Sequence, residues 1–328
     1  MQITNITSQE GSAPITPEKK VAGRVGKTLK FFLSNPKIVV GVGVVLFFVL
    51  IALAAPLLTP YAPDARVVRG LQPTQPPSPA HLFGTTDLGQ DVFSQVVYGA
   101  RVTLLIAFVA AFGSTALQVL FGLTSAYLGG LVDDVLSLII NVGLVLPGLP
   151  LTIVLASLAS AANVNKNEIV IALVLLFTSW QYGARVLRAQ TLSLKEREFV
   201  AAARAVGESA WRIIFVEILP NELALVASTF VGTFVYVMGA EIALEFLGLG
   251  DPSQASWGSI LYWAQNDAAL PSGQWWLFVP AGLCIALFCG SLAFINFGID
   301  EIANPRLHIE KPLKKALKSL KKTKEAVA

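Results

Sequence analysis

Charged residues are scarce in this chain. Asp, Glu, Lys and Arg make up 14% of its 328 residues, while 54% of the residues are hydrophobic. Soluble globular domains carry about 25% charged residues, so this composition excludes them. The chain has only two cysteines, Cys284 and Cys289, and only two histidines. We therefore expect no disulfide framework, and we identify no metal site.

The sequence also lacks the phosphate-binding loop G-x-x-x-x-G-K-[ST]. The glycine clusters at 41–43 and 248–250 have no such lysine. No serine, cysteine or carboxylate is grouped with a base and an orienting residue, so an enzyme is not expected. The chain should not hydrolyse ATP on its own, and we expect no cofactor in it and no contact with nucleic acid.

Long apolar runs are abundant instead. A helix needs about 20 apolar residues to cross a bilayer. Six runs approach or exceed this length, at 38–59, 102–128, 135–158, 168–187, 223–247 and 275–298. We expect an all-α integral membrane protein with six transmembrane helices. Pro147 and Pro150 interrupt the third run, where they either open the backbone towards a cavity or kink the helix.

Positive charge is distributed unevenly along the chain. All but four of its 24 Lys and Arg residues lie at 19–37, 185–212 and 306–324. The positive-inside rule places these segments in the cytoplasm, so both termini are expected there in a multi-pass protein of the cell (inner) membrane. The expected units are a cytoplasmic arm (1–36), a permease domain (37–305) and a basic cytoplasmic tail (306–328). Within the domain we expect an extracytoplasmic loop at 60–101 and a cytoplasmic loop at 188–222.

Two segments are expected on the outer face. In the first, Asp87 is predicted to cap a helix, with Val92, Val96 and Gly99 lying along the membrane surface. In the second, at 248–274, the rings of Trp257, Tyr262 and Trp263 suit the lipid–water interface. Either segment could be only a connecting loop or part of an aromatic belt.

The segment 198–221 is polar, basic and helix-prone, although apolar runs flank it. Phe199, Ala202, Ala203 and Val206 are spaced to form one stripe on a helix. Gly207 suits a C-terminal cap, Ser209 can cap a second helix, and Pro220 is predicted to end the unit. The pattern predicts helix, turn, helix. It fits either a docking surface or an amphipathic connector on the membrane.

Glu241 and Glu245 are the most conspicuous polar residues within an apolar run. A carboxylate is costly inside a bilayer, so each should face protein or water. They are candidates for the lining of a translocation path. A structural hydrogen bond to a neighbouring helix is the alternative.

The chain resembles the C-type membrane subunit of oligopeptide and dipeptide ATP-binding-cassette (ABC) importers over residues 35–306. The resemblance rests on six segments: NPKIVVGVGVV (35–45), APLLTPYAPD (55–64), GTTDLGQDVFSQVVYGAR (84–101), GLTSAYLGGLVDD (122–134), EFLGLGDPSQASWGSIL (245–261) and DEIANPRL (300–307). In that family a cytoplasmic loop with the pattern EAA, three residues, Gly, nine residues, Ile-x-Leu-Pro docks on the ATPase. The matching residues here are Ala201, Ala202, Ala203, Gly207, Glu217, Leu219 and Pro220; Ala201 replaces the family's Glu, and Glu217 replaces its Ile.

The resemblance implies a type I ABC importer transmembrane fold with a coupling-helix loop. It implies import of oligopeptides or dipeptides by alternating access. The implied partners are a homologous second permease, two ABC ATPases that bind ATP and Mg, an extracytoplasmic binding protein and the lipid bilayer. The docking surface would comprise the seven residues of the loop pattern together with Phe199, Arg204 and Val206.

Two alternatives stay open. The same kind of importer could move oligosaccharides or another solute, because the binding protein largely sets specificity. A stand-alone secondary transporter would need ionisable groups in several spans and usually an internal repeat. Only Glu241 and Glu245 answer that description.

Overall fold

The computed structural model describes residues 35–68, 73–162 and 168–303. Within these ranges the chain is helical, and pairing between extended segments is limited to two isolated bridges. Almost all of the expected N-terminal arm and the whole expected basic tail lie outside the described residues. The expectation of an all-α protein is confirmed for the described part.

Four continuous helices are long and apolar enough to cross a membrane. They are α2 (Pro36–Leu53), α4 (Val92–Leu128), the helix formed by α10 (Ala210–Arg212), η1 (Ile213–Ile218) and α11 (Leu219–Phe246), and α13 (Val279–Ala303). The third and fourth expected spans are bent pairs of helices. α5 (Gly130–Val145) and α6 (Gly148–Ala161) meet at 87°, and α7 (Glu168–Thr178) and α8 (Gln181–Leu194) meet at 41°.

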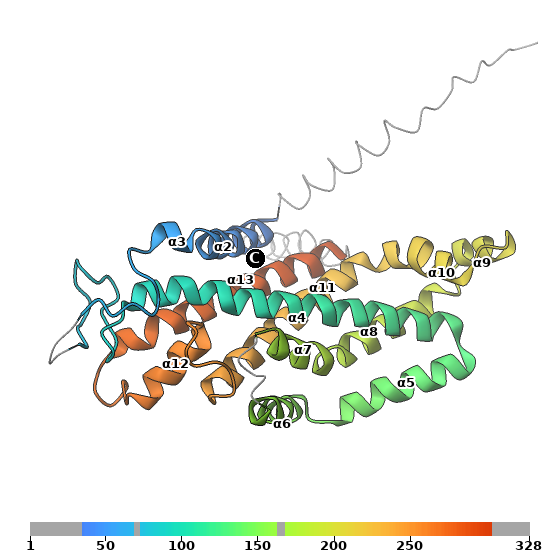
Figure 1. The fold of residues 1–328 in the computed structure, drawn as a ribbon. Coiled ribbons are helices and arrows are strands. Elements are labelled where there is room, and N and C mark those ends of the chain that lie inside the picture. The colour runs from blue at the N-terminus through green and yellow to red at the C-terminus, as the bar shows by residue number, and fades with distance from the viewer. Residues whose placement is uncertain (1–34, 69–72, 163–167, 304–328) are drawn as a thin grey trace, which may run out of the picture.

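The remaining elements are short. They are α3 (Ala55–Leu58), α9 (Glu198–Ala205), α12 (Trp257–Asn266) and η2 (Trp275–Leu277). Figure 1 shows α4 running almost the length of the molecule, with α9 and α10 near one end and α12 near the other. We refer to these as the α9 end and the α12 end.

Small residues let the long helices approach closely. A Cβ atom built on Gly122 of α4 would lie 2.6 Å from the carbonyl oxygen of Ala184 on α8. On Gly41 of α2 it would lie 2.6 Å from the carbonyl oxygen of Ser291 on α13. Such contacts leave no room for a side chain, and they are typical of helix packing in membranes. An ion pair adds to the α5–α8 contact, since Arg188 donates to both carboxylate oxygens of Asp133 at 2.8 and 2.7 Å.

Trp257 is a core residue, and the prediction that it lies at the lipid interface is wrong. Its side chain is 0% exposed, and its ring packs 5.6 Å from Phe48 and 6.5 Å from Phe288 between centroids. Its Nε1 donates to the carbonyl oxygen of Val96 at 3.0 Å, and its backbone N–H donates to Thr103 Oγ1 at 3.1 Å. This one residue joins α2, α4, α12 and α13.

Asp91, and not Asp87, caps α4. Its Oδ2 accepts from the backbone N–H of Ser94 at 2.8 Å, and its Oδ1 lies 3.0 Å from Nδ1 of His81. Val92 and Val96 are 1% and 4% exposed, so the face they share is buried and does not lie along the membrane surface. α4 then continues without a break into the second expected span.

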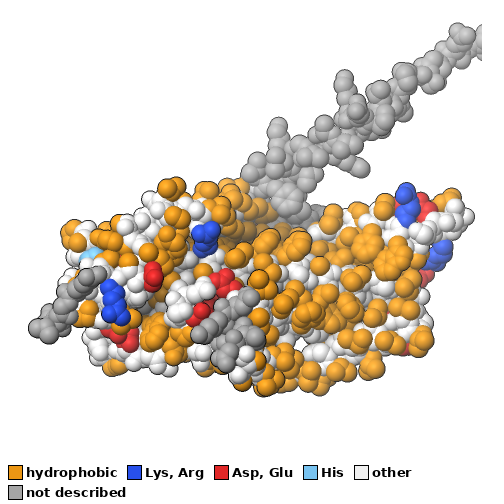
Figure 2. All heavy atoms as spheres, in the orientation of Figure 1, with side chains coloured by type: hydrophobic (Ala, Val, Ile, Leu, Met, Phe, Trp, Pro, Cys, Tyr) orange, Lys and Arg blue, Asp and Glu red, His pale blue; other side chains and the backbone are white. Residues whose placement is uncertain are grey.

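The beginning of α2 and the end of α13 lie side by side. Glu301 accepts from Asn35 Nδ2 at 3.2 Å and pairs with Lys37 Nζ at 3.3 Å. Figure 2 shows hydrophobic side chains covering much of the visible face, with Lys and Arg side chains at the tip formed by α9 and α10. An apolar surface of this kind suits contact with lipid.

Candidate functional site

The segment 198–212 has the predicted helix–turn–helix form. α9 ends in a Schellman motif, in which Gly207 N–H donates to Arg204 O at 3.1 Å and Glu208 N–H donates to Ala203 O at 3.2 Å. Gly207 has a φ of +83°, which L residues with side chains adopt at a cost. Ser209 then caps α10 by accepting from Arg212 N–H at 3.4 Å. The roles predicted for Gly207 and Ser209 as caps are confirmed.

The faces of α9 differ in part from the predicted stripe. Val200 is fully buried and packs with Leu123, Leu187 and Ile213, and Ala203 contacts the same cluster. Phe199 and Val206 are 36% and 78% exposed. The helix is thus fixed through Val200 and Ala203, while Phe199, Ala202 and Val206 present apolar surface to the outside.

The segment around α9 is tied to the end of α4. Lys195 Nζ donates to the carbonyl oxygen of Ala126 at 3.0 Å, in the last turn of α4. A cation there also interacts favourably with the helix dipole. The guanidinium of Arg204 lies 5.7 Å from the ring centroid of Tyr127. The cation–π contact and the buried cluster around Val200 therefore hold α9 against α4, and the Lys195 hydrogen bond fixes the residues just before α9.

Pro220 does not end this unit, contrary to the prediction. The helix runs from Ala210 to Phe246 without a stop, and π-helical turns precede the proline at Ile213–Ile218. Leu219 N–H donates to Ile214 O, five residues back. The wider turn provides room for a ring that would clash with the carbonyl four residues before it in a regular α-helix. Glu217 and Leu219 are partly buried, and Pro220 is exposed.

Glu241 and Glu245 are buried inside the protein, at 0% and 6% exposure. Glu245 accepts a hydrogen bond from Ser256, the N-cap of α12. Neither carboxylate oxygen of Glu241 has a hydrogen-bond partner within the described residues. Glu245 fits the structural alternative, because its hydrogen bond with Ser256 joins α11 to α12. Neither residue lines the two cavities described next.

A cavity of about 570 Å³ lies where both bent helix pairs break, and we call it the broken-helix pocket. Gly143, Leu146 and Gly148 line it from the α5–α6 break. Thr178, Ser179 and Gln181 line it from the α7–α8 break. Both alternatives considered for the prolines are observed at Pro147, where the chain bends by 87° and the break opens onto this cavity. The polar run Thr-Ser-Trp-Gln-Tyr at 178–182 was the sequence signal for the second break.

The opposite wall of this pocket comes from α11 and α13. It carries hydroxyl and amide side chains: Ser228, Thr229, Thr233, Tyr236 and Asn296. None of the described lining residues is charged. Ser228 Oγ donates to Asn296 Oδ1 at 2.7 Å, and Thr233 Oγ1 accepts from Gln118 Nε2 at 2.8 Å. The wall can form hydrogen bonds with a polar solute and carries no fixed charge.

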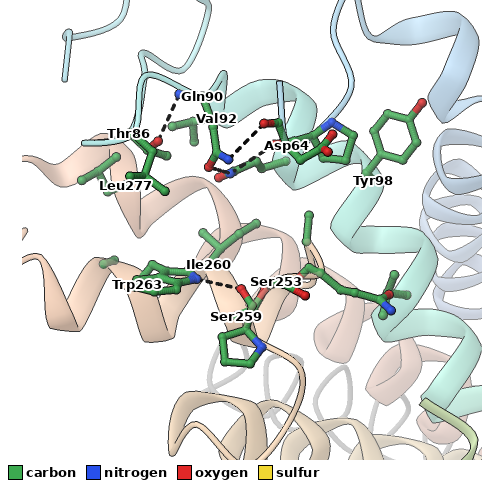
Figure 3. A pocket seen from close by; sticks show the side chains of 18 of the residues that line it. Asp64, Thr86, Gln90, Val92, Tyr98, Ser253, Ser259, Ile260, Trp263 and Leu277 are labelled. Carbon is green, nitrogen blue, oxygen red and sulfur yellow. Dashed lines mark hydrogen bonds between the residues drawn. The ribbon is translucent and has the colours of Figure 1, made fainter. Parts of the chain in front are cut away.

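A second cavity, of about 560 Å³, lies at the α12 end between the start of α4 and α12, and we call it the α4–α12 pocket. Figure 3 shows Gln90, Asp64 and Tyr98 on one wall and Trp263, Ser253 and Ser259 on the other. Gln95 Nε2 donates to Gln90 Oε1 at 2.8 Å, and Trp263 Nε1 donates to Pro252 O at 2.9 Å. Hydrogen bonds within each wall hold these polar groups in place.

Asp267 in this pocket should make stability depend on pH. Burial, and then the neighbouring carboxyl group of Asp87, raise the pKa of Asp267 from 3.8 to about 6. An acid whose pKa is raised by folding destabilises the folded state once it ionises, so stability falls as the pH rises from about 4 to about 6. We expect Asp267→Asn to raise the melting temperature by a few degrees at pH 7.5. The gain should shrink below pH 6 and vanish below pH 4.

Thermal unfolding in detergent across this pH range measures the effect. Asp64→Asn is the matched control, because Asp64 is an exposed aspartate of the same pocket. An equal gain for both variants, or a gain at pH 7.5 that persists at pH 4, would contradict the prediction.

Comparison with known proteins agrees with this architecture. Residues 118–308 match the family described as binding-protein-dependent transport system inner membrane component. Residues 26–77 match the N-terminal TM domain of oligopeptide transport permease C.

Curated relatives are similar over most of the chain. The chain is 32% identical to the oligopeptide transport system permease protein OppC of Bacillus subtilis over 278 residues, covering 84% of this chain and 88% of the relative. It is 34% identical to the dipeptide transport system permease protein DppC of the same organism over 280 residues, covering 84% and 83%. The chain therefore belongs to the family of binding-protein-dependent transport system inner membrane components.

Proposed function

We propose that this chain is one membrane half of an ATP-driven, binding-protein-dependent importer of oligopeptides or dipeptides. Its family membership and the peptide permeases among its relatives support the proposal. In the complete importer a homologous permease would form the other half. Two ATPase subunits would bind ATP and Mg, and an extracytoplasmic binding protein would deliver the solute.

The observation that carries the proposal is the apolar tip of α9. Phe199, Ala202 and Val206 are exposed, while Val200 and Ala203 fix the same helix to the interior. A rigid helix with exposed small and apolar residues can fit a groove of a partner without losing much conformational freedom. We propose that the ATPase docks here, on a surface formed by Phe199, Ala201, Ala202, Ala203, Arg204, Val206, Gly207, Glu217, Leu219 and Pro220.

The proposed topology has six spans, with each bent pair counted as one. The start of α2 and the end of α13 would then lie on the same side of the membrane, and their pairing through Glu301 supports this arrangement. The positive-inside rule makes that side, together with α9, cytoplasmic. The α4–α12 pocket would then face outwards, where the binding protein releases its solute.

The proposed mechanism is alternating access. ATP binding would close the ATPase dimer, and α9 would transmit the movement to the membrane helices. A nearly complete shift between two states needs about 5.5 kcal/mol of differential binding, which a rigid α9–α4 unit can transmit and a frayed loop cannot. For the path itself, the broken-helix pocket is better supported than Glu241 and Glu245, because it is a cavity and they are buried in packing contacts.

A single charge at the docking tip should release the ATPase. We expect Val206→Glu to reduce the ATPase subunits that co-purify with the tagged chain by more than tenfold, because the interface would have to bury an unpaired carboxylate. The sister permease should still be recovered. The measurement is affinity purification from the native membrane in mild detergent, with quantified partners and an ATPase assay.

Leu57→Glu is the matched control, since Leu57 is 89% exposed on α3, away from α9. It should leave ATPase recovery unchanged. Recovery of the wild-type chain alone, active in liposomes without ATP, would overturn the proposal in favour of a secondary transporter. Recovery of a complex that accumulates sugars and no peptides would overturn only the choice of solute.

A further inference from the structure

The broken-helix pocket has an unusual location for broken backbone. The breaks at Leu146–Pro147 and Ser179–Trp180 each divide an apolar segment into two helices. Only the two helices together are long enough to span a membrane. Backbone groups outside a helix need partners at membrane depth, and such breaks are tolerated only inside protein or against a water-filled cavity. Both breaks line this one cavity. It is therefore expected to hold water.

The starts of two helices also lie at this cavity. α6 and α8 both begin here, and neither has a side-chain hydrogen bond to its cap. The first N–H groups of each helix are thus left to bind water or a solute. The end of α5 brings carbonyl groups to its break as well, whereas Leu175, Leu176 and Phe177 at the end of α7 accept hydrogen bonds from side chains.

The cavity therefore offers hydrogen-bond donors and acceptors without a net charge. Asp300 lies near the lining; it is exposed and accepts from Ser228 Oγ at 3.2 Å. A fixed charge in a low-dielectric site would retain solutes of opposite sign and exclude those of like sign. Donors and acceptors of this kind instead match the amide and carbonyl groups that all peptides share.

We propose that the broken-helix pocket is a hydrated, charge-free compartment that holds a peptide by its main-chain groups, whatever the charge of its side chains. This inference rests on the proposed import of peptides. It assigns binding of the peptide backbone to this chain and predicts that the pocket does not select by charge.

Gly232 gives a clean place to test it. It lines the pocket on α11, it is exposed, and a Cβ built on it has no atom within 4 Å. A charge placed here should create selectivity that the pocket lacks. We expect Gly232→Asp to shift the ratio of Ala-Lys-Ala to Ala-Glu-Ala uptake about tenfold in one direction and Gly232→Lys about tenfold in the other. Gly232→Asn should leave the ratio at its wild-type value.

Uptake of Ala-Ala-Ala, Ala-Lys-Ala and Ala-Glu-Ala is measured with the whole purified complex in liposomes. Because the variants differ only in this chain, selectivity from other subunits cancels in the ratio. If uptake of none of the three peptides requires this chain, the proposed function is wrong. If uptake requires the chain but Asp and Lys change both charged peptides equally, the charge-free compartment is wrong.

A second measurement does not depend on transport. In a chain with Cys284 and Cys289 replaced by alanine, the thiol of Gly232→Cys should react in the purified complex with both cationic and anionic methanethiosulfonate reagents. Relative to their rates with free 2-mercaptoethanol, the two rates should agree within about threefold, since no fixed charge separates them. If neither reagent reacted with the thiol, the proposal that the pocket is hydrated would be wrong. If one reagent reacted tenfold faster than the other, the proposal that the pocket is charge-free would be wrong.

Discussion

Peptide uptake is expected to fall at least tenfold when Gly207 is replaced with valine, while the complex still hydrolyses ATP. Gly207 has a φ of +83°, and its backbone closes α9. A residue with a Cβ costs about 1 to 2 kcal/mol in a left-handed conformation, and β-branching adds to this. The turn should relax to another geometry and rotate α9 away from the position that its partner needs. In liposomes, the rate of ATP hydrolysis would be retained while the rate of peptide uptake would fall.

The space around Gly207 makes this a test of backbone conformation. A Cβ built there meets no atom within 4 Å, so a clash cannot explain a defect. Gly207→Asn should retain most of the uptake, because asparagine tolerates the left-handed region. Gly239→Val is the second control, since Gly239 also has free space and no positive φ. Equal uptake by the Gly207→Val variant and the wild type would show that the turn does not couple the subunits.

The largest loss of stability is expected from Trp257→Ala. Removing a buried tryptophan costs about 3 to 5 kcal/mol, from lost apolar contact and the cavity left behind. Here the change would also leave the carbonyl oxygen of Val96 without its 3.0 Å donor. Since the ring contacts Phe48 and Phe288, α2 and α13 should loosen together with α12. We expect a lower melting temperature and less folded protein in the membrane.

Trp257→Phe keeps most of the aromatic packing, while it loses the indole donor and part of the ring volume. It should cost less than half as much as the alanine variant. Trp263→Ala is the surface control, since Trp263 is 43% exposed on the same helix. If alanine at both positions had the same small effect, Trp257 would not hold the four helices together.

The sequence was sufficient where a local rule decides the structure. Gly207 and Ser209 have cap roles that depend only on neighbouring backbone, and both are confirmed. The apolar runs also located the helices, because burial in lipid needs length and composition more than particular partners. The resemblance to the permease family was recognisable for the same reason, since its motifs keep their order along the chain.

Prediction failed where tertiary contacts choose between local options. Asp87 and Asp91 can both cap a helix, and the 3.0 Å contact of Asp91 with His81 is part of the choice. Trp257 suits an interface by composition, yet packing with Phe48 and Phe288 buries it. Pro220 normally stops a helix, but the π-helical turns before it absorb the strain. The broken-helix pocket needs two breaks 30 or so residues apart to coincide in space, which periodicity cannot show.

The length of α4 has a mechanical consequence. Its 37 residues extend about 55 Å, well beyond the hydrocarbon core of about 30 Å. One end contacts the α9 segment through Ala126 and Tyr127, and the other forms a wall of the α4–α12 pocket through Gln95 and Tyr98. If this rod tilts by about 5° around its midpoint, each end moves by about 2 Å in opposite directions. A movement of α4 that closes the protein on one side of the bilayer would then open it on the other side. The geometry of the single helix is sufficient for this, and no chain of further contacts between its two ends is needed.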